Sequence, residues 1–122
     1  MIADSVNILG TTWKIMQCKK KEDAYLAGLG GYTDVTTKTI VIRKRRETPK
    51  VKDCKDLREL ERGSLRHEIV HAFMQESGLW YNSARWTGAW AMNEEMVDWI
   101  AQQHEKIHAA FVEAGAINPD TI

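Results

Sequence analysis

One octapeptide carries most of the structural information in this chain: Arg66-His67-Glu68-Ile69-Val70-His71-Ala72-Phe73. On a helix, residues four apart share a face with their Cβ atoms about 6 Å apart, so the two imidazoles can bind one cation. Glu68 follows the first histidine and would lie beside that cation, where it can take a proton from a water molecule. The apolar neighbours predict a buried helix, and a metal ion is a physical reason to bury two histidines and a glutamate.

The residues around this octapeptide predict the length of the helix. Apolar residues recur at helical spacing from Asp53 onward, namely Leu57, Leu60, Leu65, Ile69, Ala72 and Phe73. We expect a helix over about 55–77 that stops at Gly78. The Gly63-Ser64 pair either divides it into two helices, with Ser64 as an N-cap, or is only a weak point within one.

The first half of the chain reads as strands, between about residues 6 and 43. Segments 6–10 and 12–16 carry β-branched and aromatic residues around Gly10-Thr11, as a hairpin would. Segments 29–34 and 38–43 form a second pair, with the apolar Ile40 and Ile42 alternating with more polar residues. The fold class that follows is α+β, with a small N-terminal antiparallel or mixed sheet packed on the histidine helix and on a C-terminal helix.

A last helix is expected over about 90–114, ending before Gly115. It begins with Asn93-Glu94-Glu95 and places Asp98 one turn after Glu94. A catalytic zinc takes three protein ligands and keeps one position open. An antiparallel helix reached through a loop would return Glu94, 23 residues after His71, to the metal. Asp98 would accept a hydrogen bond from the far nitrogen of a liganding histidine.

The same pentapeptide pattern occurs a second time, as His104-Glu105-Lys106-Ile107-His108. Glu94 lies ten residues before His104, about 15 Å along a helix, and cannot serve both sites. Lys106 would also repel a cation. We therefore predict one metal site, of His67, His71 and Glu94 with Glu68 as base, and a solvated helix face at His104 and His108.

Composition narrows the class of protein. The 122 residues are enough for one domain, and we expect 1–122 to be a single one. Seventeen basic and seventeen acidic residues balance, so no overall field favours nucleic acid. The local basic run over 43–46 is read as a solvated turn. Two cysteines, no signal-peptide pattern and no long apolar stretch lead us to expect a cytoplasmic protein with reduced thiols and no membrane contact.

The octapeptide helix, the Asn93-Glu94-x-x-x-Asp98 segment and the strand Lys38-Thr-Ile-Val-Ile together resemble the gluzincin-type zinc metallopeptidases. The compact ImmA/IrrE-like peptidase domain of phages and mobile elements is the most similar. Its second helix follows a Glu-x-x-Ala-Asn/Asp-x-Phe-Ala pattern, which 94–101 matches with Val97 for Ala and Ile100 for Phe. The resemblance implies a zincin-like fold, Glu94 as the third zinc ligand with Glu95 as the alternative, and a protein or peptide substrate such as a transcriptional repressor.

These observations predict a hydrolase that cleaves peptide bonds with one Zn²⁺, although Mn²⁺, Fe²⁺ or Co²⁺ would suit the same ligands. The strand around Ile40 is expected to pair with an extended substrate. Tyr32 and Tyr81 have the chemistry of a transition-state stabiliser, but core or surface positions are favoured for them, and core positions for Trp80, Trp86 and Trp90. The alternatives are a non-catalytic zinc-containing adaptor or antirepressor, and, least favoured, a nucleic-acid-binding module.

Overall fold

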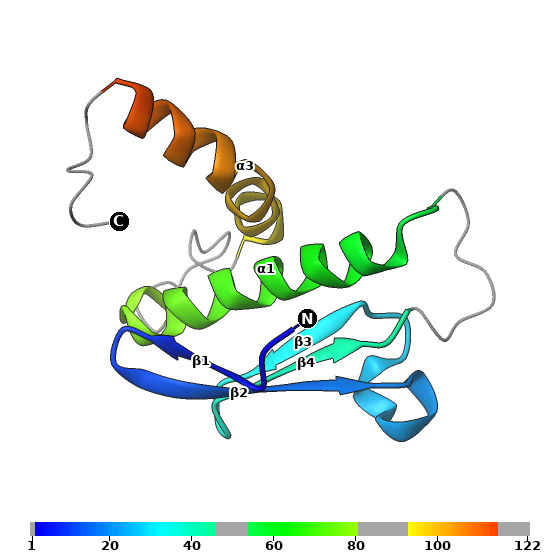
Figure 1. The fold of residues 1–122 in the computed structure, drawn as a ribbon. Coiled ribbons are helices and arrows are strands. Elements are labelled where there is room, and N and C mark those ends of the chain that lie inside the picture. The colour runs from blue at the N-terminus through cyan, green and yellow to red at the C-terminus, as the bar shows by residue number, and fades with distance from the viewer. Residues whose placement is uncertain (1, 46–53, 81–92, 115–122) are drawn as a thin grey trace.

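The computed structural model describes residues 2–45, 54–80 and 93–114, and shows an α+β fold (Figure 1). A mixed sheet of four strands, in the order β1-β2-β4-β3, lies under helix α1, and helix α3 crosses α1 on the side away from the sheet. In chain order the elements are β1 (Ser5–Ile8), β2 (Thr11–Cys18), the 3-10 turns η1 (Lys20–Glu22) and η2 (Ala24–Leu26), β3 (Gly31–Asp34), β4 (Thr39–Arg43), α1 (Leu57–Glu76) and α3 (Glu94–Glu113).

The two expected hairpins are both present, and they join through a parallel contact. β1 pairs with β2 and β3 with β4 in antiparallel fashion, whereas β2 runs parallel to β4, with Ile15 opposite Ile40. The expectation that the strand around Ile40 pairs with a substrate is therefore wrong. β4 has a neighbour on each side, and β3 is the edge strand of this hairpin.

The core lies between the sheet and α1. Alternate residues of the strands point to one face because the side-chain period of a strand is two. These residues, together with one from α1, form a cluster that is almost completely buried: Ile8, Trp13, Ile15, Ile40, Ile42 and Ala72. Leu65 and Ile69 of α1 pack against it, so the helix that carries the histidines is fixed on the sheet.

Helix α1 is continuous through Gly63 and Ser64, so the two-helix alternative with Ser64 as an N-cap is wrong. The N-cap is Asp56, whose carboxylate accepts a hydrogen bond from the backbone N–H of Glu59 at 3.0 Å. Packing along the whole helix outweighs a cost of about 1 kcal/mol for one interior glycine. At the other end the helix stops before Gly78, whose φ of +88° favours glycine.

The C-terminal end of α1 is also bonded to the sheet. The Glu76 carboxylate accepts hydrogen bonds from Trp13 Nε1 at 2.9 Å and Thr11 Oγ1 at 3.2 Å, and lies 3.1 Å from Lys38 Nζ. Burial raises the pKa of Glu76, but these donors and the Lys38 charge lower it more, so its net pKa is below the usual value. This contact fixes the direction in which α1 crosses the strands.

Helix α3 begins at Glu94, four residues later than expected, with the Asn93 side chain accepting a hydrogen bond from the N–H of Met96 at 3.0 Å. Val97 and Ala101 are buried, and the helix packs on α1. Neither α1 nor the described part of α3 combines the length and apolar character required to cross a membrane. Residues 81–92, between α1 and α3, lie outside the described residues.

The basic run over 43–46 is only partly a solvated turn, because its first residue belongs to a strand and its first three residues are partly shielded from solvent. Arg43 ends β4, and Arg43, Lys44 and Arg45 are all half-buried. The backbone N–H of Arg45 donates to the buried carboxylate of Glu61 at 2.7 Å. Arg46, the last residue of this run, lies outside the described residues.

Candidate metal centre

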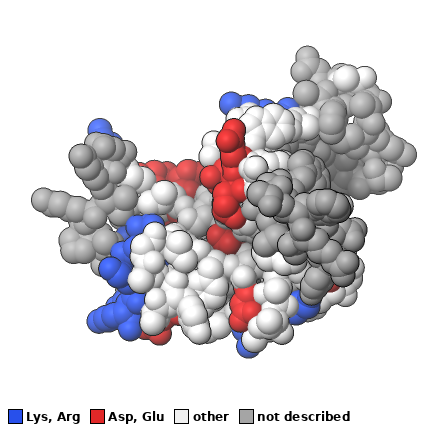
Figure 2. All heavy atoms as spheres, turned by 180° about the vertical axis from the view of Figure 1, so that it is seen from behind, with Lys and Arg blue, Asp and Glu red and all other residues white. Residues whose placement is uncertain are grey.

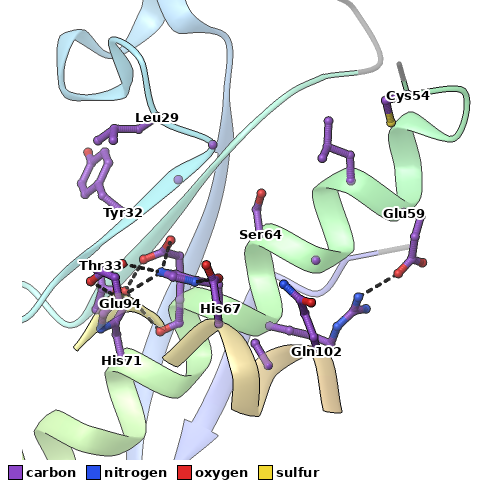
Figure 3. Close-up of a pocket in the computed structure, with 18 of the residues that line it drawn as sticks. Leu29, Tyr32, Thr33, Cys54, Glu59, Ser64, His67, His71, Glu94 and Gln102 are labelled. Carbon is purple, nitrogen blue, oxygen red and sulfur yellow. Dashed lines mark hydrogen bonds and ion pairs between the residues drawn. The ribbon is translucent and has the colours of Figure 1, made fainter. Parts of the chain in front are cut away.

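The two histidines of the octapeptide converge, as their spacing predicts (Figure 3). His67 and His71 are one turn apart on α1, and their Nε2 atoms lie 3.1 Å from each other. The rings meet edge to face, with centroids 4.8 Å apart. Both side chains are largely shielded from solvent, with 18% of the His67 side chain and 9% of the His71 side chain exposed.

The Glu94 carboxylate of α3 contacts both of these imidazoles from the side opposite α1. Its Oε2 lies 3.1 Å from His67 Nε2, and its Oε1 lies 3.1 Å from His71 Nε2. Among the described residues, Glu95 makes no hydrogen bond or ion pair with either histidine. The structure thus brings Glu94, and not the alternative Glu95, to the two imidazoles, because Glu94 lies on the face of α3 that packs against α1.

Asp98, one turn after Glu94, contacts the far side of the His67 ring. Its Oδ1 lies 2.5 Å from His67 Nδ1, as a short hydrogen bond donated by the ring. A proton held on Nδ1 leaves the lone pair of Nε2 directed at Glu94 and His71. Burial lowers the pKa of His67, but the Asp98 hydrogen bond and the charges of Glu68, Asp98 and Glu94 outweigh it, so the net pKa is raised.

His71 has a different environment from His67. Burial lowers its pKa, and the positive charge of His67 lowers it further, against the opposing effect of Glu94. Its Nδ1 is buried and has no hydrogen-bond partner within the described parts of the chain. A neutral imidazole with its Nε2 aimed at the cluster is the form that a metal requires.

Glu68 lies beneath the histidines and is almost fully buried, with 6% of its surface exposed. Its Oε2 lies 4.0 Å from His67 Nε2, while its Oε1 accepts a hydrogen bond from Thr33 Oγ1 at 2.9 Å. Burial raises the pKa of Glu68 above its usual value, although the His67 charge and the Thr33 hydrogen bond oppose the rise. A carboxylate with a raised pKa is suited to accept a proton and return it.

The donor set fits one divalent cation. His67, Glu68 and His71 offer ligand atoms that all lie within 4.8 Å of one another. Two donors that bind one tetrahedral zinc at about 2.0–2.1 Å each are separated by roughly 3.3 Å. The distances of 3.1 Å among His67 Nε2, His71 Nε2 and the Glu94 carboxylate are close to that value. Two imidazoles and one carboxylate are also the ligands of a catalytic rather than a structural zinc.

A cleft of about 1070 Å³ opens in front of these side chains, which is enough for several residues of an extended peptide. Acidic residues outnumber basic ones in its lining, with Asp56, Glu59, Glu68, Glu94 and Asp98 against Lys55 and Arg66. Figure 2 shows Asp and Glu side chains gathered in a band across the middle of one face, with Lys and Arg mainly at the margin. Such a lining attracts a cation.

The aromatic residues near the cleft agree only partly with the positions predicted for them from the sequence. Trp80, for which a core position was favoured, is half-buried and lines the cleft, with its ring 6.0 Å from that of His71. The hydroxyl of Tyr32 donates to Asp23 instead of pointing to the histidines. Burial and this hydrogen bond raise the pKa of Tyr32. Tyr81, Trp86 and Trp90 lie outside the described residues.

The second pentapeptide has no comparable surroundings. His104 and His108 are exposed on α3, as expected for a solvated helix face. His104 Nδ1 is 3.0 Å from the carbonyl oxygen of Ala101 in its own helix, which is a local contact. Within the described residues, no carboxylate from another element is paired with either histidine.

The contact between Thr33 and Glu68 was not predicted from the sequence. Thr33 lies on β3, 35 residues before Glu68, and its hydroxyl contacts both the carboxylate and the backbone carbonyl of Glu68. Nothing in the local sequence around Thr33 points to this role, since it depends on how α1 crosses the sheet.

No protein-family model, no curated protein and no solved structure matches this chain. Inference about function therefore depends on the geometry of the candidate metal centre and on the chemistry of its side chains.

Proposed function

We propose that this protein is a zinc-dependent peptidase that hydrolyses a peptide bond in a protein or peptide substrate. The observation that supports this most strongly is the convergence of His67, His71 and Glu94 beside a buried Glu68, whose Oε2 lies 4.0 Å from His67 Nε2. A purely structural zinc site has four protein ligands and no use for a base. In the proposed site, His67, His71 and Glu94 are the three ligands, and they line the cleft together with Glu68.

In the proposed reaction, His67, His71 and Glu94 would hold the ion, and the hydrogen bond to Asp98 would keep the His67 ring in the required tautomer. A bound zinc supplies Lewis acidity, which lowers the pKa of water and polarises a carbonyl group. Glu68 accepts a proton from the attacking water while the water oxygen forms a bond to the acyl carbon of the substrate. Glu68 then returns that proton to the leaving nitrogen as the carbon–nitrogen bond breaks.

The edge strand β3 offers a place for the substrate backbone. Arg43 N donates to Gly30 O at 2.9 Å, so Gly30 and Arg43 form a hydrogen-bonded pair of the β3–β4 ladder. Bonded and non-bonded pairs alternate along an antiparallel ladder. Gly31 and Thr33 consequently turn their N–H and C=O groups away from β4, toward the cleft that both residues line. An extended peptide can pair with these groups.

The proposal is tested by Glu68→Gln, with Glu105→Gln as the matched control, because Glu105 occupies the same position of the second pentapeptide. Zinc-loaded proteins are incubated with a complex peptide mixture, and new termini are identified by mass spectrometry. We expect cleavage by the wild type and by Glu105→Gln, and at least a 100-fold slower reaction by Glu68→Gln with zinc content unchanged. Absence of cleavage by the zinc-loaded wild type, or undiminished cleavage by Glu68→Gln, would contradict the proposal.

A non-catalytic adaptor predicts a different result from the same pair of variants. An adaptor that uses zinc only to hold its fold has no need of a proton acceptor in the cleft. Binding of its target protein would then be the same for Glu68→Gln and for Glu105→Gln.

A further inference from the structure

The two oxygens of the Glu68 carboxylate are not equivalent in this structure. Oε1 accepts the hydrogen bond from Thr33 Oγ1 at 2.9 Å, whereas Oε2 lies on the side of His67, 4.0 Å from its Nε2. A hydroxyl has one proton to donate. The shorter contact of Thr33 is to Oε1, and its distance to the backbone carbonyl of Glu68 is 3.2 Å. One carboxylate oxygen is therefore held, and the other is left to face the metal centre.

The same residue also faces the cleft with its backbone. Thr33 is a non-bonded position of the β3–β4 ladder, so its N–H and C=O point away from β4. Its side chain stands perpendicular to the sheet, on the side of α1, which is how it reaches Glu68. Thr33 thus joins the open edge of the sheet to the carboxylate beside the histidines.

We propose that Thr33 is the positioning residue of the peptidase centre: its hydroxyl fixes Glu68 Oε1 so that Oε2 accepts the proton of the attacking water. This inference rests on the proposed function, since it assigns how the base of that reaction is oriented.

The inference is tested by a pair of substitutions that differ in one hydroxyl. Thr33→Val keeps the shape of the side chain and removes the donor, whereas Thr33→Ser keeps the donor. Thr39→Val is the matched control, because within the described parts of the chain the Thr39 hydroxyl donates to the backbone carbonyl of Thr37, in the turn before β4, and not to Glu68. Each variant is purified with zinc bound and compared for kcat, KM and zinc content on a peptide that the wild type cleaves.

We expect Thr33→Val to lower kcat by about 10- to 100-fold, the range for losing a hydrogen bond that orients a catalytic group. KM should change by less than about threefold and zinc content not at all, because neither the ligands nor the backbone edge is altered. Thr33→Ser should recover most of kcat, and Thr39→Val should match the wild type. Unchanged kcat in Thr33→Val, or an equal loss in Thr33→Ser, would overturn the inference.

Crystal structures of the wild type, Thr33→Val and Thr33→Ser give a readout that does not depend on turnover. The Glu68 carboxylate should keep one orientation in the wild type and in Thr33→Ser, and should rotate or adopt a second conformer in Thr33→Val. If it stays in place in Thr33→Val, the positioning role of the hydroxyl is refuted even when the enzyme is active. If the wild type binds zinc but cleaves nothing, the proposed function fails, and the Glu68 orientation still decides whether Thr33 holds this carboxylate.

Discussion

Replacing Asp98 with asparagine should weaken zinc binding while leaving the fold intact. The Asp98 carboxylate lies 2.5 Å from Nδ1 of His67, on the side of the ring away from the proposed ion. An asparagine oxygen can still accept the ring N–H, so Asp98→Asn removes the negative charge and keeps the hydrogen bond. The affected quantity is the basicity of the His67 imidazole toward the metal.

The structure limits the size of this effect. Partners of liganding histidines typically contribute 10- to 100-fold in metal affinity. The Asp98 side chain is 56% exposed, so water and salt screen its charge and the lower end of that range applies. We expect Asp98→Asn to raise the zinc dissociation constant by about 10-fold, which corresponds to about 1.4 kcal/mol.

A competition titration against a chromophoric zinc chelator at pH 7.5 measures this change directly. Asp4→Asn is the matched control, since Asp4 is exposed near the start of β1, far along the chain from the metal centre. The dissociation constant of Asp4→Asn should equal that of the wild type. A value for Asp98→Asn within about twofold of the wild type would show that the negative charge of Asp98 does not strengthen the binding of zinc by His67.

Two further predictions concern the fold that positions the centre. Trp13→Ala should lower the free energy of unfolding in urea by about 3–5 kcal/mol, because the indole is fully buried in the core; a loss below 1 kcal/mol would contradict that packing. The carboxylate of Glu76 has a lowered pKa, so its contribution to stability is present above the unfolded value of about 4.3 and is lost as the pH falls through the folded value. Glu76→Gln should therefore be less stable than the wild type at pH 7, and the difference should shrink at pH 3; a difference that is the same at both values would refute the assignment.

Local patterns in the sequence were sufficient for the elements and for most of the centre. The i, i+4 spacing of His67 and His71 determines that both lie on one face of a helix, whatever the rest of the fold. Glu94 was predicted from its separation of 23 residues from His71 and from the resemblance of 94–101 to a family pattern, and the structure places Glu94 and Asp98 at the imidazoles. The choice between the two similar pentapeptides followed from separations along the chain, since only the first is followed by a helix that can return a carboxylate to it.

The order of the strands could not be predicted in the same way. Whether β2 pairs with β4 in parallel depends on contacts between segments that are distant in the chain, and both hairpins satisfy their own patterns with either arrangement. This pairing places Ile40 in the interior of the sheet and leaves β3 as an edge strand. The contact of Thr33 with Glu68 follows from that arrangement and has no signature in either segment alone.

The claim on which the other inferences depend is that one metal ion is held between α1 and α3 by His67, His71 and Glu94. Zinc content and zinc affinity of the wild type, Glu94→Ala and Glu95→Ala test it most directly. We expect one zinc per wild-type chain, an unchanged affinity in Glu95→Ala, and a loss of about 100-fold or more in Glu94→Ala, which has only two of three protein ligands. Wild-type affinity in Glu94→Ala would contradict the two-helix site, whether or not Glu95→Ala also binds normally.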